Sequence, residues 1–158
     1  MALLQISEPG QSQDPHKKKF YIGIDLGTTN SLVALIQNGS TTLLKDKNNS
    51  ELFPSIVTYT KNSVSIGDDY EKNESITFRS IKRLIGKNIN DIDQSSFYSP
   101  CEYIGDDNVV KFSVFEKLLT PIEISSEILK YLKKVTEETM LGEIEGCVIT
   151  VPAYFDDA

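Results

Sequence analysis

The sequence predicts an α/β fold, and two patterns support that prediction. Short apolar runs rich in β-branched residues lie in the first 60 residues and again at 146–151, as is typical of strands. Between them, apolar residues recur at steps of four, four and three, at Ile124, Ile128, Leu132 and Val135. This is the clearest amphipathic helix of the chain. With 158 residues, 39% hydrophobic and 25% charged, the chain is long enough for one domain with a packed core.

Three strands at 20–25, 31–37 and 41–45 are expected to pair as an antiparallel sheet. Asn38-Gly39, between the second and third, is a strong signal for a two-residue hairpin turn. Residues 1–19 precede the sheet as a polar, flexible lead. Its lysine triplet at 17–19 is interpreted as a solvated flank, because three lysines fall short of a basic patch.

Further elements follow in the middle of the chain. Pro54 begins a new segment because it cannot donate inside a central strand, and short strands are expected at 55–60 and 63–67. From residue 76 the pattern predicts a short amphipathic helix that ends at Gly86, with apolar residues at Phe78, Ile81 and Ile85. Residues 88–107 read as loop, and 109–115 as a strand.

The last third of the chain predicts a helix followed by a strand. The helix starts after Thr120-Pro121 and ends at Gly142, and 146–151 is expected to be a buried strand. The solvated face of the helix carries Glu127, Lys130, Lys133, Lys134 and Glu137.

Composition excludes several kinds of protein. The net charge of −7 argues against a general nucleic-acid binder. Cys101, Cys147 and the single His16 lack the spacing of a zinc site, and Cys147 is expected to be a small buried residue. No apolar run approaches the ~18 residues of a membrane span, and the start lacks the features of a secretory signal. We therefore expect a reducing, cytoplasmic setting.

The nine residues GIDLGTTNS at 23–31 read as strand, tight turn and strand. Asp25 ends the first strand, and Thr28 and Thr29 lie at the tip. Gly27 brings no side chain and can adopt positive φ, so backbone N–H groups there can approach a ligand closely. Such N–H groups and hydroxyls suit an anionic oxygen. A carboxylate beside a phosphate requires a cation, and Mg²⁺ prefers one or two carboxylates with water and phosphate oxygens. The stretch therefore predicts a metal–nucleotide site.

An ordinary reading of the same residues stays open. Asp and Thr at a hairpin tip often only hydrogen-bond to their own backbone. The chain also has no G-x-x-x-x-G-K-[ST] pattern, so it is not a P-loop protein.

Three motifs in order, GIDLGTTNS at 23–31, SIKRLIG at 80–86 and VITVPAYF at 148–155, resemble the heat-shock chaperone ATPases of the DnaK family. The resemblance covers residues 20–158. The first nine residues, MALLQISEP, and the final FDDA at 155–158 are similar to the branch of that family that serves iron–sulfur cluster assembly.

The resemblance implies an actin-like ATPase (ribonuclease H-like) fold, of which this chain would be the first lobe of the nucleotide-binding domain. Its inner subdomain would hold 20–53 and 121–158, and its outer subdomain 54–120. The second lobe and the peptide-binding domain would lie outside this sequence. Because the nucleotide would meet only half of its pocket, we expect the 158-residue chain by itself neither to hydrolyse ATP nor to bind it tightly.

The resemblance also implies roles for individual residues. Asp25 would hold Mg²⁺ through water, together with a monovalent cation such as K⁺. Lys82 would reach the γ-phosphate and the attacking water, and Pro152 would be a switch that relays nucleotide state. Phosphate contacts would come from Gly27, Thr28, Thr29 and Asn30. From the residues alone, Lys82 is interpreted as a solvated flank of its helix. Pro152 can be a strand terminator as well as a switch.

The resemblance implies a chaperone that cycles between ATP-bound and ADP-bound states. Its client would be an IscU-type scaffold peptide, and its co-chaperone an HscB-type J-domain protein. A sugar or glycerol kinase of the same superfamily is the main alternative. Such kinases share the Asp-x-Gly-Thr-Thr loop but usually place a basic residue soon after it, where this chain has Asn30-Ser31, and they lack the VPAYF segment. A non-catalytic remnant or an actin-like assembly module is the third possibility.

Overall fold

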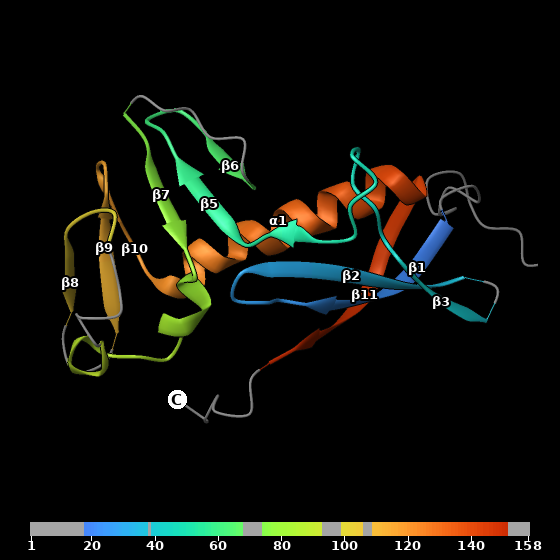
Figure 1. Cartoon of the computed structure of the whole chain (residues 1–158), viewed down its shortest axis with the longest axis horizontal. Helices are drawn as coiled ribbons and strands as arrows, with labels where there is room; N and C mark the ends of the chain where they lie inside the picture. Colours follow the sequence, from blue (N-terminus) through green and yellow to red (C-terminus); the bar gives the residue numbers. More distant parts are fainter. Residues whose placement is uncertain (1–17, 38, 68–73, 93–98, 106–108, 152–158) are drawn as a thin grey trace, which may run out of the picture.

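The computed structural model describes residues 18–37, 39–67, 74–92, 99–105 and 109–151 (Figure 1). The elements are, in chain order, β1 (Lys18–Asp25), β2 (Asn30–Gln37), β3 (Ser40–Leu43), β4 (Phe53–Pro54), β5 (Ile56–Tyr59), β6 (Val64–Ile66), β7 (Ile76–Arg79), the 3-10 helices η1 (Ile81–Leu84) and η2 (Ile89–Asp91), β8 (Tyr103–Gly105), β9 (Val110–Val114), β10 (Lys117–Leu119), the helix α1 (Pro121–Met140) and β11 (Gly142–Thr150).

The strands form three sheets in the described ranges. A five-stranded sheet has the order β11-β1-β2-β3, with β4 pairing to β2, and its β1 and β11 are parallel. The other two sheets, β6-β5-β7 and β10-β9-β8, are antiparallel. Helix α1 runs from the small sheets to the large one and contacts strands of all three (Figure 1). The α/β class and the hairpin between β2 and β3 are confirmed, and Asn38 of its turn lies outside the described residues.

A single hydrophobic core joins the sheets to α1. The apolar stripe of the helix is fully buried at Ile124, Ile128 and Leu132. Between the small sheets, the ring of Phe78 on β7 packs edge-on against that of Phe112 on β9, with ring centres 5.1 Å apart. Edge-to-face pairs of this kind add to the stabilisation that burial alone gives. The amphipathic helix predicted from the sequence is therefore confirmed, with its apolar face toward the strands.

Strand β11 contains one residue more than the segment of β1 that it faces. Phe20 lies opposite Ile144, but Tyr21 lies opposite Gly146, so Glu145 is the extra residue of a β-bulge. A Cβ at Gly146 would come within 2.8 Å of the Tyr21 ring, so any larger residue there would require that exposed side chain to shift. After the bulge the pairing continues without interruption to the ends of both strands.

The helix predicted from residue 76 is wrong. Residues Ile76–Arg79 form β7, and only Ile81–Leu84 form a short 3-10 helix. Ser80 separates the two in a left-handed conformation, with φ 55°. The apolar residues Phe78 and Ile81 fit a helical spacing, but pairing with β5 fixes Ile76–Arg79 as a strand. A pattern over so few residues does not distinguish the two structures.

Two expectations for the end of the chain are also wrong. Helix α1 ends at Met140, two residues before the predicted end at Gly142, and Leu141 follows it with φ 50°, whereas Gly142 already begins β11. Glycine is needed there because a Cβ would lie 2.3 Å from the Lys18 carbonyl oxygen. Strand β11 is not buried, and Cys147 and Val148 are exposed. The reason is its position at the edge of the sheet, where β1 is its only partner among the described strands.

Strands β8 and β10 have three residues each, and the sequence did not predict them. Residues 1–17 of the predicted lead lie outside the described residues, as does Pro152. Lys18 and Lys19, which were assigned to the lead, instead begin β1 as exposed residues. The subdomain boundaries at 53/54 and 120/121 stay a prediction.

The start of α1 provides a pH-dependent contribution to stability. Hydrogen bonds from the Thr120 backbone N–H, at 2.7 Å, and from its hydroxyl lower the pKa of the Glu123 carboxyl. A lowered folded-state pKa means that this stabilisation is present above the ordinary glutamate pKa of about 4.3 and is lost as the pH falls through the folded value. We expect Glu123→Gln to be less stable than the wild type at pH 7. The difference in unfolding free energy, measured by denaturation with circular dichroism, should shrink below about pH 4. An unchanged difference at low pH would contradict this assignment.

Candidate functional site

The carboxyl ends of the parallel strands β1 and β11 meet at one edge of the large sheet. Asp25 is the last residue of β1, and Thr150, directly opposite, is the last residue of β11. The Thr150 hydroxyl donates a 2.5 Å hydrogen bond to Oδ1 of Asp25. Both side chains are exposed to solvent. Ligands of α/β sheets typically bind beyond such strand ends, so this edge is the natural place for a site.

The loop from Leu26 to Thr29 is held in place by the neighbouring segment at Pro54 and Ser55. The Ser55 backbone N–H donates to the Thr29 carbonyl at 2.8 Å. The hydroxyls of Ser31 and Ser55, both buried, lie 2.9 Å apart. Strand β4 adds a pairing of Asn30 with Pro54. These contacts hold the turn in one conformation, as a preformed phosphate loop requires.

Gly27 is required for a reason that the sequence did not reveal. Its backbone φ is not positive, unlike that of Gly39, Gly67 and Gly86. Instead, a Cβ at Gly27 would lie 1.9 Å from the carbonyl oxygen of Asn30. The loop is so tight that the start of β2 folds back against the glycine. The expected positive φ is therefore wrong, and the close approach of backbone N–H groups to a ligand stays a prediction.

Replacing Gly27 with alanine tests this geometry. The new methyl group would collide with backbone rather than with a movable side chain, so we expect a loss of about 3 kcal/mol in unfolding free energy. Gly23→Ala is the matched control, because its Cβ would meet only the Ala34 side chain, at 3.7 Å. Urea denaturation of both variants measures the effect. Equal stability of the two variants would contradict the tight turn.

Lys82 reaches the loop from a different part of the chain. It lies on η1, whose residues Ile81 and Leu84 are buried in the core and leave Lys82 half-buried. Its ammonium group donates to the carbonyl oxygen of Leu26, the residue after Asp25. This anchored position differs from that of a lysine on a solvated flank. The structure thus places a positive charge beside the loop.

The structure brings six of the seven predicted site residues to one edge of the sheet; Pro152, the seventh, lies outside the described residues. Gly27 and Thr28 are half-buried and Thr29 and Asn30 are exposed, so the tip of the loop is open to solvent. One carboxylate, with hydroxyls, backbone N–H groups and a lysine near it, fits a magnesium ion that keeps part of its water shell and binds phosphate oxygens. The roles assigned to these residues stay predictions.

Sequence reasoning missed three residues at this edge. Ser31 and Ser55 hold the loop, and Thr150 contacts the carboxylate. A signal was available for Thr150, because it is a polar residue near the end of the apolar run at 146–151, as Asp25 is at the end of the first strand. The parallel pairing that makes them neighbours was not predicted.

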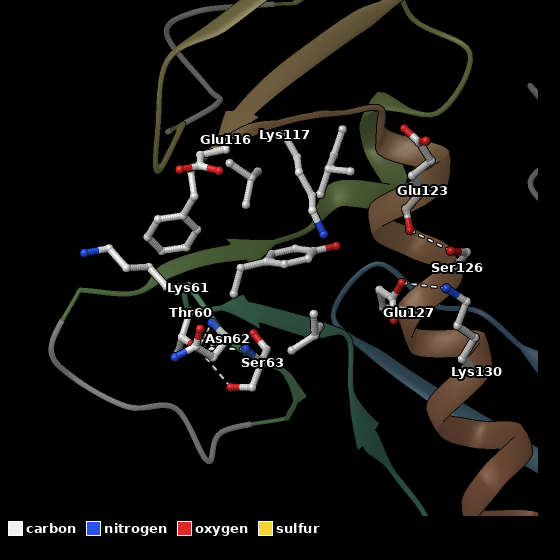
Figure 2. A pocket seen from close by; sticks show the side chains of 15 residues that line it. Thr60, Lys61, Asn62, Ser63, Glu116, Lys117, Glu123, Ser126, Glu127 and Lys130 are labelled. Carbon is white, nitrogen blue, oxygen red and sulfur yellow. Dashed lines mark hydrogen bonds and ion pairs between the residues drawn. The ribbon is translucent and has the colours of Figure 1, made fainter.

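A separate pocket of about 830 Å³ lies between the turns of the β5–β6 and β9–β10 hairpins and the first half of α1 (Figure 2). Thr60–Ser63 line one side, and Glu123, Ser126, Glu127 and Lys130 of α1 line another (Figure 2). Three lysines and three glutamates line it, so its charges balance. Burial, and then the charges of Glu127 and Glu123, raise the pKa of Tyr59 at its wall. Among its described lining residues there is none of the predicted nucleotide site.

The chain matches the family model described as Hsp70 protein over residues 21–158. It belongs to the Hsp70 family. Three similar proteins, each called "Chaperone protein HscA homolog", come from Histophilus somni (strain 129Pt), Neisseria meningitidis serogroup B (strain MC58) and Vibrio atlanticus (strain LGP32). Their identities to this chain are 47%, 45% and 46%. Each alignment covers the whole of this chain and 26% of the relative, so the chain spans about a quarter of their length.

Membership of the Hsp70 family confirms the resemblance and the actin-like ATPase fold, and the three sheets with one long helix are consistent with part of its first lobe. The family implies nucleotide binding. Membership of this family argues against the sugar-kinase alternative. In the described part of this Hsp70 chain, no helix is both long and apolar enough to cross a membrane.

Proposed function

We propose that this chain is the first nucleotide-binding lobe of an ATP-driven, HscA-like chaperone. The observation that carries the proposal is the convergence of Asp25, the loop at residues 27–30 and Lys82 at one edge of the large sheet. These groups come from segments more than 50 residues apart, and together they supply a carboxylate, hydroxyls, backbone donors and a cation. That set suits a magnesium-bound polyphosphate.

We assign each of these groups a role in binding the metal or the phosphates. Asp25 would hold Mg²⁺ through its water shell, with K⁺ as a second cation at the same edge. The backbone N–H groups of the loop at residues 27–30, and the hydroxyl of Thr28, would contact phosphate oxygens. Lys82 would release the Leu26 carbonyl and turn to the γ-phosphate and the attacking water. Bound Mg²⁺ would neutralise charge that develops on the phosphate oxygens.

The proposed client and co-chaperone rest on the similarity of this chain to HscA homologues. We infer that the full-length protein cycles its affinity for an IscU-type scaffold peptide during iron–sulfur cluster assembly, with an HscB-type J-domain co-chaperone, in the cytoplasm. The names of the similar proteins and the resemblance of residues 1–9 support this. Pro152 would relay the nucleotide state from this lobe to the peptide-binding domain.

The test is ATP turnover by the full-length protein that contains this lobe. We expect scaffold-derived peptide together with a J-domain co-chaperone to accelerate phosphate release, and sugars or glycerol to have no effect. A scrambled peptide of the same composition is the control. Turnover that responds to a sugar and not to the peptide would establish the kinase alternative. Absence of any Mg²⁺-dependent nucleotide binding would favour the non-catalytic remnant.

A further inference from the structure

We propose that Thr150 is a positioning residue for Asp25. Its hydroxyl holds the carboxylate in the orientation that the metal–nucleotide complex needs. This inference rests on the proposed function of the loop at residues 27–30. None of the roles implied by the family resemblance includes Thr150.

The geometry of the pair is that of a strong hydrogen bond. Thr150 Oγ1 donates to Asp25 Oδ1 at 2.5 Å, which is the length range of a hydroxyl bonded to a carboxylate. The bond uses one carboxylate oxygen and leaves Oδ2 for other ligands. A carboxylate on an exposed side chain otherwise turns readily about its last torsion, which has a broad preference. The hydroxyl limits that rotation.

The position of Thr150 is itself well defined. Residues 146–150 of β11 pair in unbroken register with residues 21–25 of β1. Groups carried by paired strands are placed more accurately than groups on loops. The bulge at Glu145 sets this register, since pairing of Glu145 with Tyr21 would instead place Ile149 opposite Asp25.

Lys82, Ser31 and Ser55 contact other partners. Lys82 donates to the Leu26 carbonyl, and the Ser31 and Ser55 hydroxyls bond to each other. Among the described residues, Thr150 is thus a side chain that the structure places on this carboxylate.

Calorimetry of ADP binding to the full-length protein, with Mg²⁺ and with a chelator, tests the proposal. Thr150→Val keeps the shape of the side chain and removes the donor. We expect it to weaken Mg²⁺-dependent ADP binding about tenfold, as the loss of an outer-shell partner typically does. Binding without Mg²⁺ should not change. Thr150→Ser keeps the hydroxyl and should restore affinity to within about twofold. Thr41→Val, at an exposed site on β3, is the control for loss of a threonine hydroxyl.

Each outcome decides between specific alternatives. If Asp25→Asn weakens Mg²⁺-dependent binding but Thr150→Val does not, the positioning role is wrong and the proposed function stands. If neither substitution matters, both fail. An equal loss with and without Mg²⁺, or a loss that Thr150→Ser shares, would show that Thr150 only supports the fold. In an Asp25→Asn background, Thr150→Val should add no further loss.

Discussion

Asp25→Asn is expected to lower the peptide-stimulated ATP turnover of the full-length protein about 10²-fold, with a matching loss of Mg²⁺-dependent nucleotide affinity. Asparagine keeps the size of the side chain and removes the negative charge that a hydrated cation needs. It also changes the acceptor of the Thr150 hydroxyl at the end of β11. Steady-state phosphate release, measured over a range of Mg²⁺ concentrations, should show that higher Mg²⁺ rescues part of the activity.

The control for this experiment is Glu138→Gln. It removes one negative charge from a side chain on α1 that is 65% exposed and far from the loop in sequence. Its turnover should equal that of the wild type. Undiminished, peptide-responsive turnover in Asp25→Asn would overturn the proposal that this carboxylate holds the metal.

Lys82→Ala is expected to reduce kcat about 10²–10³-fold, which is the usual loss when one preorganised donor to a developing negative charge is removed. The effect on ADP affinity should be much smaller, because a group that acts mainly in the transition state changes kcat rather than ground-state binding. Single-turnover measurement of ATP hydrolysis separates the chemical step from nucleotide release. Lys82→Arg should recover only part of the rate, because its planar, forked donors differ from a compact ammonium group.

Arg83→Ala is the matched control for Lys82. Arg83 follows it on η1 but is exposed to solvent, whereas Lys82 is half-buried against the loop. Loss of a neighbouring positive charge at Arg83 should leave kcat unchanged. Equal effects of the two substitutions would mean that only the general positive charge of η1 matters.

The sequence was sufficient for elements with a long, regular pattern. Helix α1 was predicted because its apolar stripe extends over several turns and its start carries Thr120 and Pro121. The loop at 23–31 was predicted between two strands because its turn residues and carboxylate lie between two apolar runs. In both cases residues close in the chain determine the structure, and local patterns report them well.

The remaining features depend on contacts between distant segments. Ile76–Arg79 is a strand because β5 pairs with it, and the exposure of Cys147 depends on the place of β11 at a sheet edge. From the residues alone, Lys82 was a solvated flank, and only the family resemblance pointed to the loop. Its contact with Leu26, 56 positions earlier, cannot be read from either local sequence. The partnership of Asp25 and Thr150 is of the same kind, since 125 positions separate them.

The single bulge in β11 has a consequence for changes in chain length. It lets Gly142 fit closely beside Lys18 at one end of the strand pair while Thr150 faces Asp25 at the other. Deleting Glu145 would leave eight residues of β11 facing the eight of β1 and keep both ends paired. Inserting a residue into β11 would instead force one end to slip, and a slip by one position turns every side chain of the displaced part to the opposite face. Insertions between the end of α1 and the tip of β11 should therefore not be tolerated.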